Sequence, residues 1–197
     1  MSVSWARRCV KETVLFVVDA SGSMGAKKRM SIVKGVIFKM LLEAYQKRDR
    51  VGMIAFRKKK AEVLLPITRS VEFAQKKLAD LPTGGKTPLA SGLRKAEDVL
   101  DMLYRQEPTQ EPVVILITDG RATAGSNPDS DPVADALREG ARLRRRNLPI
   151  AVIDTESGYI RLGLAEKLAD IMGASYFHVD KLSEDSLLHI WRTTTED

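Results

Sequence analysis

An apolar run at residues 13–18 ends in the carboxylate of Asp19, and this junction constrains the fold of the chain more than any other feature. A β-branched run of this length predicts a buried strand of a parallel sheet, which delivers Asp19 to the sheet edge. Side-chain oxygens recur at every second residue, in Asp19, Ser21 and Ser23. Gly22 lets the loop bend sharply. Three oxygens presented to one point suit a small hard cation, so we expect Mg2+ or Mn2+ here. A turn held by side-chain to backbone hydrogen bonds is the alternative interpretation.

Strand-like apolar runs alternate with amphipathic helical patterns along the chain. The expected strands are residues 13–18, 51–56, 62–67, 113–118, 150–154 and 174–179. The expected helices are residues 30–46, 71–81, 89–104, 132–146, 162–172 and 183–192. This alternation predicts an α/β fold, a doubly wound and mostly parallel sheet with helices on both faces. Only the turn at residues 57–60 separates the second and third strands, so one of them is expected to be an antiparallel edge strand.

The length of 197 residues suits one domain with a proper hydrophobic core. We expect a lead-in at residues 1–12, the domain at 13–193 and a tail at 194–197. No apolar run approaches the ~20 residues that cross a bilayer. Residues 1–12 also lack the apolar stretch of a signal peptide, so the cytoplasm is the expected compartment. The single cysteine, Cys9, excludes an internal disulfide framework and a cysteine-rich zinc site.

The net charge of +6 is spread over separate elements and is not interleaved with aromatic residues. Solvated helix faces and loop tips are the expected role of these bases. An acidic protein surface is the next interpretation, and nucleic acid is the least favoured partner.

Two further loops offer oxygen ligands at the same edge of the sheet. Asp119 follows the strand at 113–118, and ligands of open α/β sheets gather beyond the carboxyl ends of strands. Thr87 opens the helix at 89–104. We expect it to be the N-cap, with Pro88 at the first helical position. The Thr87 hydroxyl could then face either the helix amides or a metal.

Two enzymatic interpretations are disfavoured. The sequence GKT at 85–87 looks like the end of a phosphate-binding loop, but Asp80 stands where the required glycine should be, and a helix precedes the loop. A hydrolase with Asp19 as nucleophile would need a second carboxylate where Ser21 stands. No Gly-x-Ser-x-Gly elbow is present, and the two histidines, His178 and His189, fall late in the chain.

The sequence DASGS at 19–23, with Thr87 and Asp119, resembles the metal-ion-dependent adhesion site of von Willebrand factor A domains. In that family an aspartate and two serines of one loop, a threonine of a second and an aspartate of a third surround Mg2+. The resemblance implies that the metal ligands are Asp19, Ser21, Ser23, Thr87 and Asp119. It also implies a protein–protein interaction module in which an aspartate or glutamate of a partner completes the metal shell.

A narrower resemblance covers nearly the whole chain, from about Trp5 to Trp191. The stretches RVGMIAFRKKKAEVLLPITR (50–69), GGKTPLASGL (84–93) and DTESGYIRLGLA (154–165) are similar to the C-terminal A domain of the magnesium chelatase D protein, which is similar to cobalt chelatase subunits too. The resemblance implies a non-catalytic part of an ATP-dependent complex that inserts Mg2+ or Co2+ into a tetrapyrrole. The implied partner is the ATPase subunit, with the porphyrin-binding subunit as a further candidate.

The chelatase D protein also carries an ATPase-like domain and an acidic, proline-rich linker, neither of which is in this sequence. The chain is therefore expected to be either an excised domain or a stand-alone relative. An interaction module of another A-domain and ATPase assembly, not linked to tetrapyrroles, is the alternative function. Asp154 and Glu156 stand at another strand end, where we expect them to cap the loop rather than bind a partner.

Overall fold

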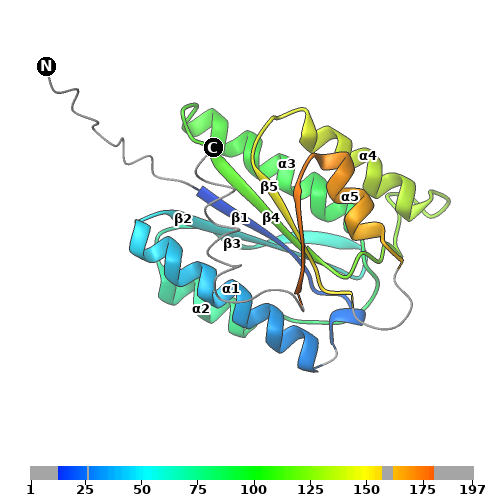
Figure 1. Cartoon of the computed structure of the whole chain (residues 1–197), viewed down its shortest axis with the longest axis horizontal. Helices are drawn as coiled ribbons and strands as arrows, with labels where there is room; N and C mark the ends of the chain where they lie inside the picture. The colour runs from blue at the N-terminus through cyan, green and yellow to red at the C-terminus, as the bar shows by residue number, and fades with distance from the viewer. Residues whose placement is uncertain (1–12, 26, 157–161, 180–197) are drawn as a thin grey trace, which may run out of the picture.

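The computed structural model of the protein describes residues 13–25, 27–156 and 162–179. In this part of the chain six strands form one sheet (Figure 1). The strands are β1 (Thr13–Asp19), β2 (Arg50–Arg57), β3 (Lys60–Thr68), β4 (Pro112–Thr118), β5 (Ile150–Asp154) and β6 (Ser175–His178). β1, β4 and β5 are buried along their whole length, because their apolar runs meet helices on both faces.

The strand order, β3-β2-β1-β4-β5-β6, places β1 and β4 at the centre of the sheet. All neighbouring strands pair in parallel except β2 and β3, which form the expected antiparallel hairpin with β3 at the edge. The chain moves outward from β1 through β2 to β3 and then returns to β4 on the other side of β1. The strand order therefore reverses between β1 and β4, and a crevice at their carboxyl ends is where such sheets bind ligands.

Helices cover both faces of the sheet, as the alternating pattern predicts. The helical segments are η1 (Ser23–Gly25), α1 (Lys27–Lys47), α2 (Val71–Ala79), α3 (Leu89–Gln106), α4 (Pro132–Arg144) and α5 (Leu164–Met172). Figure 1 shows α1 and α2 on one face of the sheet and α3, α4 and α5 on the other. The side chains of β1 alternate between the two cores. Val14, Phe16 and Val18 pack with α1 and α2. Leu15 and Val17 pack with α3, α4 and α5.

One local expectation is wrong. The N-cap of α3 is Pro88 rather than Thr87, and it makes no side-chain capping hydrogen bond. The reason is that the backbone of Thr87 is bound to the loop after β4. Its N–H donates to the Thr123 hydroxyl at 2.8 Å, and its carbonyl accepts from the Thr123 N–H at 3.1 Å. The expected helix at 183–192, Cys9, His189, the lead-in and the tail lie outside the described residues.

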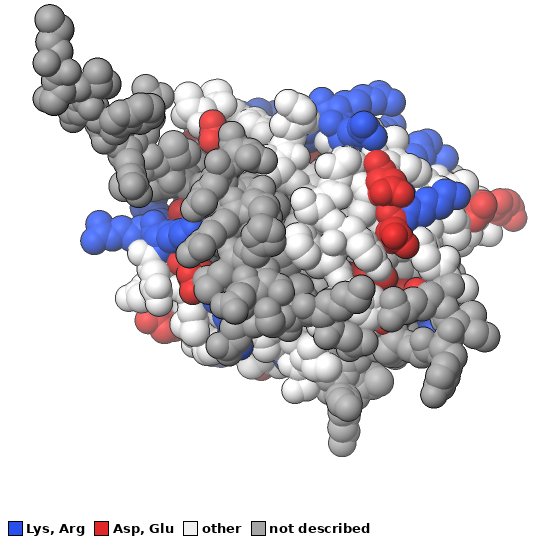
Figure 2. Space-filling view, viewed as in Figure 1, with Lys and Arg blue, Asp and Glu red and all other residues white. Residues whose placement is uncertain are grey.

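Charges of both signs lie near one another on the surface. Figure 2 shows lysine and arginine beside aspartate and glutamate on this face, not one continuous basic patch. Among the helices of the described residues, none combines the length and the apolar character needed to cross a bilayer.

Candidate metal site

The loop after β1 folds around the carboxylate of Asp19. The Ser21 N–H donates to Asp19 Oδ1 at 2.8 Å, and the hydroxyls of Ser21 and Ser23 share a hydrogen bond of 2.9 Å. Asp19 and Ser21 are fully buried, and Ser23 is partly buried. The loop therefore contains a turn held by a side-chain to backbone hydrogen bond, which was the alternative interpretation of the sequence. The same turn places the side-chain oxygens of Asp19, Ser21 and Ser23 in one small loop.

The third loop lies next to the first because β1 and β4 are neighbours. The Thr118 hydroxyl, at the end of β4, donates to Asp19 Oδ2 at 3.1 Å and accepts from the Gly120 N–H at 3.1 Å. Thr118 thus ties Asp19 to the loop that carries the buried Asp119. Thr118 was not among the residues predicted from the sequence. Its position directly before Asp119, at the end of an apolar strand, is the signal that could have found it.

Asp19 and Asp119 interact electrostatically at this junction. Burial raises the pKa of Asp19 from 3.8 to about 7, because desolvation disfavours the charged carboxylate. Hydrogen bonds from Ser21 and Thr118 lower this pKa, whereas the negative charge of Asp119 raises it further. Two buried carboxylates that repel each other form a place where a bound cation would relieve both the repulsion and part of the desolvation.

The loop that carries Thr87 is bound to the loop after β1. The Gly22 N–H donates to the Gly85 carbonyl at 2.8 Å, and the Gly84 N–H donates to the Ala20 carbonyl at 2.9 Å. Since Thr87 is also bound to Thr123, its loop bridges the first and third loops. The Thr87 side chain is buried and stands outside α3, so the helix amides do not occupy its hydroxyl.

The five predicted ligands therefore lie on three loops that bind one another at the switch point. Asp19, Ser21 and Ser23 are in direct hydrogen-bond contact, Asp119 is joined to them through Thr118, and Thr87 is joined through the backbone of its loop. The described residues contain no cluster of three or more His, Cys, Asp or Glu side chains able to hold a metal. A cation here would depend on two carboxylates and three hydroxyls, an all-oxygen set that suits Mg2+ or Mn2+.

Basic side chains stand at the rim of this site. Gly85 has a φ of +88°, and a Cβ on it would lie 2.6 Å from the side chain of Lys58, so the turn between β2 and β3 packs directly on the Thr87 loop. Arg121 Nε lies 3.8 Å from Asp119 Oδ2. The turn between β2 and β3 lies far along the sequence from the loop after β1 and from the Thr87 loop. The antiparallel hairpin brings this turn to the site.

Asp154 and Glu156 make hydrogen bonds within the loop after β5, as expected of a loop cap, and His178 also contacts this loop. Asp154 accepts hydrogen bonds from the Glu156 N–H at 2.7 Å and the Tyr176 hydroxyl at 2.6 Å. Glu156 Oε1 accepts from the Leu162 N–H at 2.8 Å. The buried His178 places Nε2 2.8 Å from the Glu156 carbonyl. These contacts give the three residues a structural role.

The fold and the three joined loops define an A-type domain, a doubly wound sheet with oxygen-bearing side chains at its switch point. The von Willebrand factor type A domain family matches residues 14–121, more than half of the chain. The chain belongs to this family.

Several relatives resemble most of the chain. An uncharacterized protein of Methanocaldococcus jannaschii is 40% identical over 171 residues, which are 86% of this chain and 97% of that protein. An uncharacterized protein of Mycobacterium tuberculosis is 41% identical over 191 residues, 94% of this chain and 30% of that protein. The magnesium-chelatase 67 kDa subunit of Heliobacterium mobile is 39% identical over 180 residues, 88% of this chain and 27% of the subunit. The chain thus spans less than a third of these two longer relatives.

Solved structures agree with the fold. The vWF domain of the pilus tip protein Mfa5 from Porphyromonas gingivalis has a TM-score of 0.71 at 14% identity, over 94% of this chain and 97% of that domain. The manganese-loaded TRAP protein of Plasmodium vivax has a TM-score of 0.66 at 20% identity, over 91% of this chain and 72% of that protein.

Proposed function

We propose that this chain is a protein interaction module whose binding depends on a divalent cation, Mg2+ or Mn2+. The ligands would be Asp19, Ser21, Ser23, Thr87 and Asp119. The observation that carries the proposal is the buried pair of carboxylates at the β1 and β4 ends, joined through Thr118, with hydrogen bonds from Ser21 and Thr118 on Asp19. The manganese bound by the TRAP relative in its solved structure supports the choice of ion.

The bound cation would supply a Lewis-acidic point for a carboxylate of a partner. The hydroxyls of Ser21, Ser23 and Thr87 carry no formal charge, so the negative charge of the ligand set does not exceed the positive charge of the cation. An anionic ligand of a partner would therefore meet no surplus of negative charge at the cation. An aspartate or glutamate of the partner would complete the shell in a charge-assisted contact, offset in part by dehydration. The role of this chain's residues is to bind and orient, and we assign no catalytic step to them.

The partner we propose is the ATPase subunit of a chelatase that inserts Mg2+ or Co2+ into a tetrapyrrole. The likeness to magnesium-chelatase subunits at 39% identity supports it. The porphyrin-binding subunit is a further candidate surface for the same complex. The alternative is a module of another A-domain and ATPase assembly, and the Methanocaldococcus jannaschii relative supports it, since this chain covers 97% of that uncharacterized protein.

Metal titration of two variants tests the site. Asp19→Asn removes a charged ligand and Ser21→Ala a neutral one, while Ser31→Ala, at an exposed position of α1, serves as the matched control. By calorimetry with MgCl2 and MnCl2, we expect the dissociation constant to rise about 100-fold for Asp19→Asn and about tenfold for Ser21→Ala. Equal affinities of parent and variants, all folded by circular dichroism, would refute the site.

Partner binding separates the two assemblies. The ATPase subunit of a magnesium chelatase, immobilised on a biosensor, is expected to bind the parent chain in MgCl2 and to release it in EDTA. Asp19→Asn should bind in neither condition. If the parent chain binds the metal but does not bind this subunit in MgCl2 or in EDTA, the result would favour the alternative assembly.

A further inference from the structure

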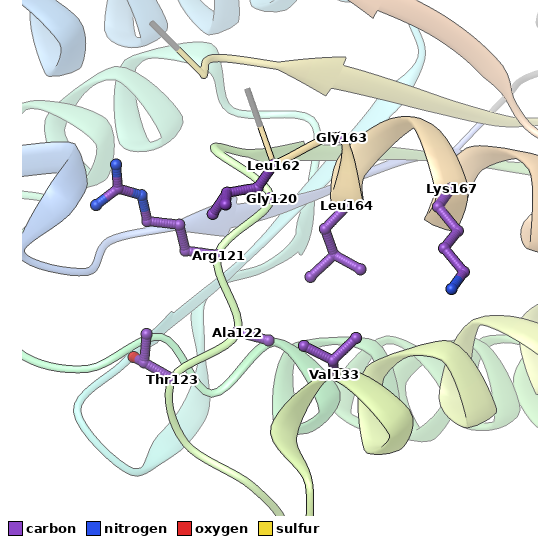
Figure 3. A pocket seen from close by; sticks show the side chains of 9 residues that line it. All are labelled: Gly120, Arg121, Ala122, Thr123, Val133, Leu162, Gly163, Leu164 and Lys167. Atoms are coloured by element: carbon purple, nitrogen blue, oxygen red, sulfur yellow. The ribbon is translucent and has the colours of Figure 1, made fainter. Parts of the chain in front are cut away.

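A pocket of about 430 Å3 opens next to Asp119, outside the proposed metal site. Ala122, Val133, Leu162 and Leu164 supply its apolar lining, and Arg121 and Lys167 supply its charges. Figure 3 shows Ala122, Val133 and Leu164 facing one another across the pocket, with Lys167 at one side and Arg121 extended on the other. Leu162 is 63% exposed, so apolar surface remains uncovered here.

The charged side chains that line this pocket determine which charge a bound ligand should carry. The described residues that line it include two cations and no carboxylate. The Arg121 guanidinium also faces Asp119 at 3.8 Å, so it spans the boundary between pocket and metal site. With Lys58 packed on the Thr87 loop, basic side chains border the site on two of its loops. The positive charges would attract an acidic peptide segment to this surface. An apolar side chain of that segment could then pack against the apolar lining of the pocket.

The distance between pocket and metal site sets the spacing that a ligand must have. Gly120 to Thr123 line the pocket, and they follow Asp119 by one to four residues. Consecutive Cα atoms are about 3.8 Å apart, so the pocket begins within roughly 4 to 15 Å of Asp119. An extended peptide rises ~3.3 Å per residue and turns its side chains to alternate sides. A carboxylate on the cation and an apolar side chain in the pocket are then about one to four residues apart.

We infer that the pocket is the second half of the partner-binding surface. It takes one apolar side chain of an acidic peptide segment, positioned about one to four residues from the carboxylate that reaches the cation. Arg121 and Lys167 contact further acidic side chains of the same segment. This inference rests on the proposed function and adds the chemistry of the partner to it.

A phage-displayed library of random heptapeptides, panned on the full chain in MgCl2 and eluted with EDTA, tests the inference. We expect the eluted peptides to pair Asp or Glu with Leu, Met or Phe at the stated spacing. A selected peptide should lose about tenfold in affinity for Leu162→Ser, since the apolar side chain that covers the peptide is removed. Lys167→Glu should weaken the same peptide and make its affinity less dependent on salt.

Matched controls lie on the far end of α3. Met102→Ser removes an apolar side chain that is 54% exposed, and Arg105→Glu reverses an exposed charge there. Both should bind the selected peptide as the parent does. Two outcomes would overturn the inference about the pocket and leave the proposed function intact. The first is a set of peptides that need Mg2+ and a carboxylate but show no preference for an apolar residue. The second is a loss of peptide affinity in Met102→Ser as large as the loss in Leu162→Ser. A library that yields no Mg2+-dependent peptide overturns the proposed function together with the inference.

Discussion

Asp19→Asn should make the metal-free protein more stable and, at the same time, insensitive to Mg2+. In the parent, Asp19 is fully buried and its pKa rises from 3.8 to about 7, first because of desolvation and further because of the charge on Asp119. Asparagine is nearly isosteric and can keep both contacts. Its carbonyl can accept from the Ser21 N–H, and its amide can donate to the Thr118 hydroxyl, which replaces the hydrogen bond that Thr118 donates in the parent.

The size of the effect follows from the shift in pKa. An acid whose pKa is higher in the folded state holds its proton more tightly there, so its contribution to stability declines as pH rises from the unfolded pKa to the folded one. One pKa unit corresponds to about 1.4 kcal/mol, so the rise from 3.8 to about 7 corresponds to about 4 kcal/mol lost above pH 7. At ~2–4 °C per kcal/mol for a domain of this size, Asp19→Asn should raise the Tm by about 10 °C in EDTA.

The assay is thermal unfolding followed by circular dichroism between pH 4 and pH 8, in EDTA and in MgCl2. The parent in EDTA should lose stability across the window from 3.8 to about 7, and Mg2+ should restore it above pH 7. Asp19→Asn should show neither the decline nor the restoration. The exposed Asp129→Asn, in the loop before α4, is the control and should follow the parent. A metal-free Asp19→Asn variant that is less stable than the parent above pH 7 would refute the reasoning.

Three further substitutions test packing and an acidic network, each by chemical denaturation or pH-dependent melting. Gly92→Ala should destabilise the protein by about 1–3 kcal/mol, because a Cβ there would lie 2.5 Å from the ring of Phe56. Gly35→Ala should stabilise it by about 0.5–1 kcal/mol, since nothing lies within 4 Å of its Cβ and the residue is in the middle of α1; a loss of stability would contradict this. Hydrogen bonds, first of all from the Ser130 hydroxyl, lower the pKa of Asp135, so its stabilising contribution is present above its unfolded pKa and disappears as pH falls through the lower folded value. Asp135→Asn should therefore reduce stability at neutral pH and flatten the acid limb of the melting profile, and an unchanged acid limb would contradict that assignment.

The elements of the fold could be predicted closely because the signals are local. The apolar run before Asp19 is a fully buried strand, and the short turn at 57–60 does produce an antiparallel edge strand. The choice of Thr87 as N-cap failed because two hydrogen bonds to Thr123, 36 residues away, compete with the local capping preference. The preference of a residue for the N-cap position predicts where a helix begins only when no tertiary contact holds that residue elsewhere.

The amino-acid sequence alone determined the α/β alternation, the three loops and the five side chains offered as ligands. Their oxygen chemistry can be read from the order of residues, and so can the places of Asp19 and Asp119 at strand ends and of Thr87 before a helix. The tertiary structure alone decided that Thr118 joins Asp19 to the Asp119 loop, that Lys58 packs on Gly85, and that Arg121 faces both Asp119 and an apolar pocket. These contacts join residues on different strands and loops, or depend on how one loop folds. The spacing of residues along the chain does not predict these contacts. The raised pKa of Asp19 likewise depends on its burial in the folded protein and on its nearness to Asp119.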